Sequence, residues 1–598
     1  MNEGGQQEPT GTLLLLEYKR PPSPPPYVCR VCMMAVSCFQ LPVWFCFSLI
    51  CLVRSVVPLA WLYFLSSLSS YLLPAQRPSH QAQNQHHPKG SALLFFLSAI
   101  EVAFSIYYLY CARLVQRRVA HFEHPTSFIR TTINRIVGSG LRPAHSNPQS
   151  GCSSNPTNSA SGSPHSADQQ PPPDPLLTIP QIYPSRPNSP SGLAPDALLA
   201  YDDPAAIDFR SNQVLWFQNC RWDEIRKDNM LEWLAWSLFS MPLEEVRLED
   251  EQMELKAEPR SNLLEEILIR FENRAGARLQ PGYNPKLANR VIRLTLDPIK
   301  IQMRPLGLYL LSNLGSLALK HYLRKAGFKH AQCTHRCPQG LEYLIRKPAG
   351  WDNLPIESRP IPLIIAHGLG IGFCQYGAFL SYIANAPWAR NKPIVILLQP
   401  SISQEVFSSQ HLRPPSKETL ATDVIQLIYT EKFAEVGVEL LGHSMGTIVI
   451  AWVVKALSNK GIIKRMCLID PVCFCTEPHV CYNFLYSKPR TGIERMIRYF
   501  VGTELGVAHH LHRYFEWRSN ILWPFEIPGF SDPKRFQVFL SEKDSILDAG
   551  RVKKYLVSNG MQDSVGIFTA QGAAHGESII EMGRHFDLVK EWLEARVC

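Results

Sequence analysis

The pentapeptide Gly442-His443-Ser444-Met445-Gly446 lies between an apolar run of strand length, residues 436–441, and a helical run, residues 447–454. A Gly-x-Ser-x-Gly sequence occurs often by chance, but a strand directly before it and a helix directly after it are what a sharp strand-to-helix turn requires. Gly442 and Gly446 fit this turn because larger side chains would clash with neighbouring strands. The segment therefore predicts a strand that ends in a tight turn and presents Ser444 at the top of a sheet, near the positive end of a helix.

Short apolar runs alternate with helical patterns throughout residues 340–598. Such alternation predicts a mostly parallel sheet with helices on both faces. The runs of strand length are 341–345, 362–366, 394–398, 436–441, 466–469, 536–540 and 565–568. The connection at about 471–535 is far longer than neighbouring strands need and is rich in aromatic residues, which is typical of a lid. We therefore expect an α/β domain over 340–598 that carries a lid.

Two long apolar runs, 41–73 and 91–114, precede that domain. Each exceeds the roughly 20 residues that a bilayer requires, and neither has a polar face of useful width. They predict two transmembrane helices that form a hairpin in a multi-pass membrane protein. Arg54 and Glu101 lie at depths that differ by about 12 Å when counted from the connector, so we expect no ion pair between them.

The charge distribution indicates the topology of this hairpin. The net charge of +9 is too dilute for nucleic-acid binding, and residues 1–142 hold twelve of the basic residues against five acidic ones. The basic residues flank the hairpin on its outer sides, whereas the connector holds only Arg77 and Lys89. The positive-inside rule then places both ends, and with them the catalytic domain, in the cytosol. We expect the endoplasmic reticulum or another endomembrane as the compartment.

The remaining segments are a tail, a linker and a helical region. Residues 1–40 are predicted to be a mobile tail. Residues 143–200 are rich in Ser, Pro, Asn and Gly, which predicts a disordered linker because too little apolar surface is available to offset the entropy of ordering. Residues 201–335 show apolar residues at three- and four-residue steps, so we predict a helical region there.

The sixteen cysteines have irregular spacings and predict no disulfide framework. Cys333 and Cys337, with His330 and His335, invite a zinc interpretation. The set lacks a second matched pair at finger spacing, as does the pair at 29 and 32. We therefore predict a polar loop and no metal site.

Ser444 is followed in the chain by an acid and a histidine, each at the end of a later predicted strand. Asp544 lies just past the run 536–540, and His575 follows the run 565–568 through a loop of small residues. A serine hydroxyl becomes a nucleophile when a histidine takes its proton and a carboxylate orients that histidine. The order Ser444, Asp544, His575 therefore predicts a catalytic triad.

Alternatives remain for both partners of the serine. Asp470 directly follows the run 466–469 and is the alternative acid. His443 adjoins the serine and His585 lies in a helical pattern near the C-terminus, so either is an alternative base. The carboxylate that contacts the imidazole decides between the acids.

The segment His367-Gly368-Leu369-Gly370-Ile371-Gly372 follows the run 362–366. The transition state of acyl transfer concentrates negative charge on one oxygen, so hydrogen-bond donors must already be in place there. We predict that the backbone amides of Leu369 and Met445 form this oxyanion hole, with His367 and Gly368 in the turn that carries it. The segment lacks the Gly-Lys-Ser/Thr ending of a phosphate-binding loop.

Together, the segments HGLGIG, GHSMG, LSEKD and AAHG resemble the α/β-hydrolase superfamily, in its lipase and esterase branch. The resemblance covers about residues 340–598 and implies serine hydrolysis or acyl transfer without a metal or an organic cofactor. Epoxide hydrolases and dehalogenases of that fold usually carry aspartate where this chain has Ser444. The two apolar runs and the stretch CRWDEIRKDNMLEWLAWSLF also resemble membrane-bound fungal members.

These patterns predict a membrane-anchored serine hydrolase that cleaves lipid-like carboxylic esters. An acyltransferase with the same triad is one alternative, and a non-catalytic membrane adaptor with a hydrolase fold is another. The expected partners are the lipid bilayer and an acyl-ester substrate. The sequence does not determine the oligomeric state.

Overall fold

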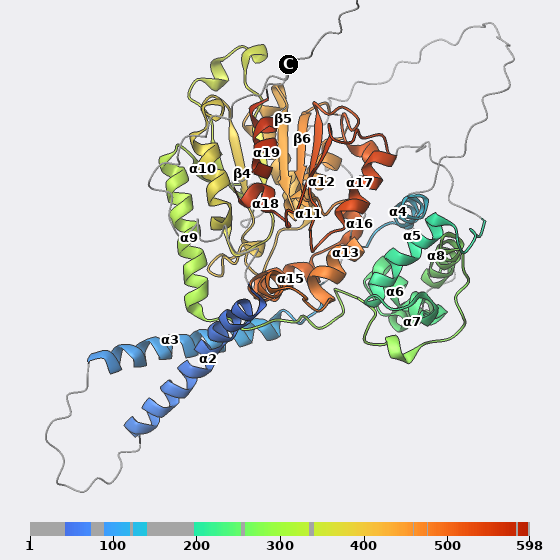
Figure 1. Ribbon diagram of the computed structural model, residues 1–598, viewed down its shortest axis with the longest axis horizontal. Helices are drawn as coiled ribbons and strands as arrows, with labels where there is room; N and C mark the ends of the chain where they lie inside the picture. Colours follow the sequence, from blue (N-terminus) through green and yellow to red (C-terminus); the bar gives the residue numbers. More distant parts are fainter. Residues whose placement is uncertain are drawn as a thin grey trace, which may run out of the picture.

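The computed structural model describes residues 42–72, 89–119, 123–139, 197–252, 258–333, 340–458, 460–474, 477–581 and 584–595. The predicted tail and all but the last residues of the predicted linker lie outside these ranges. Figure 1 shows the described residues as a helical hairpin, a group of helices and a sheet covered by helices on both faces.

The sheet has eight strands in the order β1-β2-β4-β3-β5-β6-β7-β8. Strand β2 runs antiparallel to both of its neighbours, and all later pairs are parallel. The strands are β1 (Lys329–Gln332), β2 (Glu342–Arg346), β3 (Leu363–Ala366), β4 (Ile394–Leu398), β5 (Val438–His443), β6 (Ile463–Ile469), β7 (Phe536–Ser541) and β8 (Ile567–Ala570). This order, with one inverted strand near the start, is that of the α/β-hydrolase fold, as predicted.

The predicted helical region 201–335 is wrong at its C-terminal end. The sheet already begins at Lys329, and helix α9 (Leu306–Lys325) contributes Leu319 and Leu323 to the core beneath the sheet. Strand β1 has the sequence KHAQ and is largely exposed at the edge of the sheet. It therefore shows none of the apolar alternation by which the other strands are recognised.

Each face of the sheet packs against its own set of helices. One face, with Ile365, Ile396 and Leu441, packs against α10 (Gly377–Asn385) and α19 (Arg584–Glu594). The opposite face, with Ile364, Val395 and Leu440, packs against α11, α12 and α17. These three helices are α11 (Lys417–Thr430), α12 (Gly446–Ala456) and α17 (Ala549–Ser558). Strands β3 and β4 are apolar throughout because both of their faces are buried.

The connection between β6 and β7, residues 471–535, forms a helical layer that we call the lid segment. Its elements are α13 (Glu477–Cys481), η11 (Tyr482–Tyr486), α14 (Gly492–Ile497), η12 (Arg498–Gly502), α15 (Leu505–Arg513), α16 (Trp517–Asn520) and η13 (Pro524–Glu526). Most of its aromatic side chains are buried in the main core, as are Phe474, Phe515 and Trp523, or are partly buried and pack against it. These rings therefore hold the lid segment on the body.

Helices α2 (Val43–Leu72) and α3 (Lys89–Leu114) pack against each other as a hairpin, and both are long and apolar enough to cross a membrane. Trp61 donates a hydrogen bond to Ser105 (2.9 Å), and Phe64 stacks on Phe95 at 5.5 Å between ring centroids. The end of the hairpin next to the body is integrated into it. There, α2 packs on α14, and Tyr108 and Cys111 of α3 share a core with Leu505 of α15.

The helical region beside the body consists of α5 (Pro204–Gln213), α6 (Lys227–Phe239), α7 (Leu243–Gln252) and α8 (Arg260–Ala275). Its centre is a cluster of rings in which Trp216 lies 5.6 Å from Trp233 and 5.7 Å from Trp236. Helix α4 (Thr126–Gly138), which precedes the long linker in sequence, packs on α8. The two sides of the linker therefore meet in one helical group.

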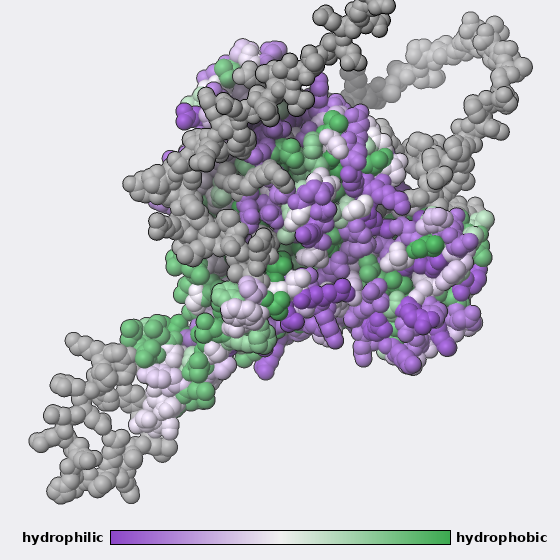
Figure 2. Space-filling model, viewed as in Figure 1, coloured by the Kyte–Doolittle hydropathy of each residue, from purple (hydrophilic) through white to green (hydrophobic). Residues whose placement is uncertain are grey.

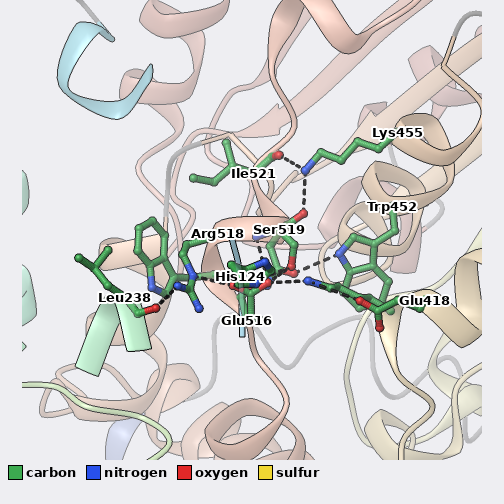
Figure 3. Close-up of polar contacts among 12 residues, drawn as sticks. His124, Leu238, Glu418, Trp452, Lys455, Glu516, Arg518, Ser519 and Ile521 are labelled. Atoms are coloured by element: carbon green, nitrogen blue, oxygen red, sulfur yellow. Dashed lines mark hydrogen bonds and ion pairs between the residues drawn. The ribbon is translucent and has the colours of Figure 1, made fainter. Parts of the chain in front are cut away.

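Glu516 joins this helical group to the body, as Figure 3 shows. Its carboxylate accepts hydrogen bonds from Lys417 of α11 (2.9 Å) and from Arg518 (2.8 Å), and it lies 3.2 Å from His124, just before α4. Arg518 in turn donates to the carbonyl of Leu238 in α6. Burial by itself would raise the pKa of Glu516, but the charges of Lys417 and Arg518 outweigh it and hold this pKa well below its usual value.

Replacing Glu516 by glutamine is expected to lower the free energy of unfolding by about 3 kcal/mol, because two cations are left buried without their anion. Glu418 is the matched control, since it lies at 3.7 Å from the same Lys417 but is 40% exposed, and Glu418→Gln should cost under about 1 kcal/mol. Equal losses in denaturant unfolding would contradict this role. In the wild-type protein, Glu516 contributes fully to the free energy of unfolding above the pKa of the unfolded state, about 4.3. This contribution is lost as pH falls towards the lower pKa of the folded state.

Candidate active site

Ser444 lies in the sharp turn between β5 and α12, as the sequence predicts. Its φ of 51° falls in the left-handed region, which is uncommon for a residue with a side chain and typical of this turn. The close approach of neighbouring strands requires the flanking glycines. A Cβ at Gly446 would lie 2.1 Å from the carbonyl oxygen of Ala366 in β3, and one at Gly442 would lie 2.9 Å from Ile450.

The sheet brings the side chains of Ser444, His575 and Asp544 together. Nε2 of His575 lies 2.8 Å from Oγ of Ser444, and Nδ1 of His575 lies 2.5 Å from Oδ2 of Asp544. Asp544 follows β7, and His575 follows β8 just before α18 (Glu577–Ile580). The other oxygen of Asp544 accepts hydrogen bonds from the amides of Ile546 and Leu547, so the carboxylate is held in place.

Asp470, the alternative acid, makes no hydrogen bond to His575. It is fully buried at the end of β6, and its carboxylate accepts hydrogen bonds from the amide of Gly576 (2.7 Å) and from the amide and hydroxyl of Ser541 (2.7 and 2.9 Å). Gly576 directly follows the histidine, and Ser541 ends the strand that leads to Asp544. Asp470 thus connects the loops that carry His575 and Asp544. Burial raises its pKa to about 6.

The other residues that the sequence offers for these roles lie elsewhere. The ring of His443 contacts Tyr376 instead of the serine, and His585 belongs to α19. The geometry therefore favours the acid and the base that the chain order predicts.

The predicted oxyanion amides face no competing partner among the described residues. Neither the amide of Leu369 nor that of Met445 donates a hydrogen bond within the part of the chain that the structure describes. Gly368 lies in the same turn, directly before Leu369, and a Cβ there would lie 2.7 Å from Cβ of Ser444. Only glycine therefore allows the turn to approach the serine this closely.

Tyr376, which sequence reasoning missed, ties the oxyanion turn to the serine turn. Its hydroxyl accepts from the amide of Gly368 (2.9 Å) and lies within hydrogen-bond distance, 2.8 Å, of Nδ1 of His443. All three groups are buried, and burial lowers the pKa of His443 well below its usual value. His367 is also buried, with Nδ1 2.9 Å from the carbonyl of Gly368. No sequence motif marks Tyr376, because it reaches the turn from η7 (Phe373–Tyr376) through tertiary packing.

Asp470, Asp544 and His575 lie close enough for one atom of each to coordinate a single metal ion. The hydrogen bonds do not favour this interpretation. Asp470 accepts three hydrogen bonds from neutral donors, and Nδ1 of His575 is occupied by Asp544. The donor set fits an acid–base relay better than a metal site.

The cysteine–histidine set at 330–337 can be assessed only in part, because residues 334–339 lie outside the described ranges. His330 lies 3.2 Å from Glu342 across β1 and β2, whereas Cys333 is buried and donates to the carbonyl of Asp423 (3.6 Å). These two side chains therefore contact different parts of the protein.

Electrostatics around His575 predict an alkaline shift of activity. Burial by itself would lower its pKa, but the carboxylates of Asp544 and Asp470 outweigh burial and raise the pKa to about 9. A general base must be neutral, so kcat/KM should rise with pH as His575 loses its proton. The midpoint of this rising limb of the pH profile should lie above 6.5, the ordinary pKa of histidine. Asp470→Asn should move this limb to lower pH, because one of the two negative charges is removed. A wild-type limb at or below pH 6.5, or an unmoved limb in the variant, would contradict this account.

No protein-family model matches this chain, and no curated protein matches it. Among solved structures, 287 chains match. The peroxisomal α/β-hydrolase of Saccharomyces cerevisiae is 13% identical, with a TM-score of 0.30, over 45% of this chain and 88% of that one. Carboxylesterase CesB of Bacillus subtilis is 13% identical, with a TM-score of 0.29, over 48% of this chain and all of that one. A carboxyl esterase of the fungus Tuber melanosporum is 15% identical, with a TM-score of 0.30, over 45% of this chain and 85% of that one.

Proposed function

We propose that this α/β-hydrolase-fold chain is a membrane-anchored serine hydrolase that cleaves carboxylic esters of lipid-like substrates. The single observation that carries the proposal is the line of hydrogen-bond contacts from Asp544 through His575 to Ser444. The strained serine turn and the unoccupied amides of Leu369 and Met445 support the same chemistry.

In the first half of the reaction, Nε2 of His575 takes the proton of the Ser444 hydroxyl while Oγ attacks the ester carbonyl carbon. The carbonyl electrons move onto oxygen, where the amides of Leu369 and Met445 donate hydrogen bonds to the oxyanion. As the carbonyl re-forms, the ester C–O bond breaks, and the imidazolium gives its proton to the departing alcohol. Asp544 stays ionised and stabilises the imidazolium. The product is an acyl ester of Ser444.

In the second half, a water molecule gives a proton to Nε2 of His575 and its oxygen attacks the acyl carbon. The oxyanion forms in the same hole, and its collapse breaks the bond to Oγ of Ser444, which recovers a proton from the imidazolium. The carboxylic acid leaves. If an alcohol replaces water, the same steps yield a new ester, which is the acyltransferase alternative.

The hairpin supports the lipid-like nature of the substrate. Helix α2 packs on α14, and Tyr108 of α3 lies in one core with Leu505 and Ala508 of α15, so the apolar helices are attached to the lid segment itself. A catalytic site tethered to a bilayer meets membrane-borne esters at high effective concentration.

Product analysis tests the proposal. The full chain, reconstituted in phospholipid vesicles, is given a monoacylglycerol or short-chain aryl ester with and without a long-chain alcohol. We expect free acid as the main product in both cases, and no turnover by the matched Ser444→Ala chain. A new ester as the main product would favour the acyltransferase. No acid or ester from a properly folded chain would favour the non-catalytic adaptor.

A further inference from the structure

Helix α9 exposes an unusual apolar face. Leu310, Leu311, Leu314 and Leu317 are 41%, 65%, 61% and 60% exposed and recur at the spacing of one helix face. The opposite face carries Tyr309, Leu319 and Leu323, which are buried against the body. Contiguous exposed apolar surface of this kind marks a binding surface on a protein, whereas single exposed leucines do not.

The N-terminal end of this helix adjoins the hairpin. The amide of Leu306, at the start of α9, donates to both carboxylate oxygens of Glu101 in α3 (3.1 and 3.0 Å). The rings of Phe104 and Tyr309 pack edge to face, with their centroids 5.7 Å apart. Figure 1 shows α9 rising from the end of the hairpin that meets the body, and Figure 2 shows the apolar surface of the hairpin continuing onto that end of the body. The end of α9 at which the leucine face begins therefore lies beside the hairpin that we assign to the bilayer.

The far end of the same helix is basic. Arg324 and Lys325, together with Lys329 at the start of β1, are exposed, and none of the three forms an ion pair with another described residue. An amphipathic helix with leucines on one face and free basic residues beside them is suited to the boundary between acyl chains and anionic headgroups.

We propose that α9 is a third membrane-contacting element, whose leucine face lies at interfacial depth in the bilayer beside the α2–α3 hairpin. This inference rests on the membrane anchoring that forms part of the proposed function. The occupant of the face is the lipid bilayer, and the basic end of α9 contacts anionic headgroups.

The arrangement has a consequence for the active site, because the oxyanion turn packs on the inner side of α9. A Cβ at Gly372 would lie 3.2 Å from Oγ of Ser316, and one at Gly315 would lie 3.3 Å from Cys374. Asn313 also donates to the carbonyl of Gln404 (2.9 Å), and Gln404 donates to the carbonyls of Gly370 (3.1 Å) and Phe500 (2.6 Å). The helix at the membrane thus contacts both the oxyanion turn and the lid segment.

Photo-crosslinking tests the contact directly. The full chain carries the photoreactive residue p-benzoylphenylalanine at position 314 and is reconstituted in vesicles of phosphatidylcholine and phosphatidylserine. We expect a phospholipid adduct at this position by mass spectrometry. The matched control is Val557 of α17, which is 39% exposed but belongs to a helix on the opposite face of the sheet from α9, and should give no adduct. The same photoreactive residue at position 59 of α2 tests whether the hairpin itself contacts lipid.

The outcomes distinguish the contact of α9 with the bilayer from the membrane anchoring of the hairpin. An adduct at 59 but not at 314 overturns the inference and leaves the anchored hairpin intact, whereas no adduct at either position overturns the anchoring as well. A crosslink from 314 to a second copy of the chain also overturns the inference. Equal adducts at 314 and 557 would show only non-specific contact and would overturn it too.

Kinetics provide a second readout. The double variant Leu311→Asp, Leu314→Asp changes only exposed side chains. It should lower kcat/KM for a vesicle-borne ester by about tenfold, through a higher KM, because charged residues oppose the interfacial contact. Its kcat/KM for a soluble short-chain ester should stay unchanged. Equal loss on both substrates, or no loss on either, would overturn the inference.

Discussion

Replacing Ser444 by alanine is expected to lower kcat/KM for ester hydrolysis by on the order of 10⁴-fold or more, because no acyl-enzyme can form without Oγ. His575 and Asp544 would remain in contact, but Nε2 of His575 would face no hydroxyl from which to take a proton. The assay compares initial rates of the two chains in the same vesicles, with thermal unfolding as the control for folding. A folded variant that keeps more than about one hundredth of wild-type activity would contradict the nucleophilic role of Ser444.

The second large effect is expected at the acid. Asp544→Asn should lower kcat by about 10⁴-fold, because Nδ1 of His575 then faces an amide that neither fixes the productive tautomer nor stabilises the imidazolium. The measurement is kcat under saturating substrate for Asp544→Asn and for Asp470→Asn side by side.

Asp470→Asn is the matched control, since it is the same change at the neighbouring carboxylate. Asparagine keeps an acceptor for the amide of Gly576 or Ser541 but loses the charge, so we expect a loss of only about tenfold together with the pH shift described above. If Asp470→Asn lowered kcat far more than Asp544→Asn, Asp470 at the end of β6 would be the acid that orients His575.

The serine turn and its partners could be predicted because their signals are local. The Gly-x-Ser-x-Gly pattern around Ser444 lies within one strand–turn–helix unit that is visible in the sequence, and Asp544 and His575 each follow an apolar strand whose pattern is visible there as well. The choice between the two acids depends on contacts between segments that are distant in the sequence. Asp470 also follows a strand, and only the register between β6 and β7 directs its carboxylate to Ser541 and Gly576.

Other features depend on contacts between distant segments. Strand β1 is polar and exposed, so it carries no period-two pattern, and its pairing with β2 alone makes it a strand. Tyr376 reaches the oxyanion turn through packing that no motif encodes. The apolar pattern of α3 predicts a membrane helix along its whole length, yet Tyr108 and Cys111 are buried against the lid segment. Burial by protein and burial by lipid select the same residues, so composition does not separate them.

The most direct test of the central claim is to identify the residue that a fluorophosphonate probe modifies in the full-length chain. Such a probe reacts with a serine that a neighbouring histidine activates. We predict one probe per chain, on the peptide that contains Ser444, with labelling lost in Ser444→Ala and in His575→Ala. A folded wild-type chain that remains unlabelled, or labelling that persists in Ser444→Ala, would contradict the account.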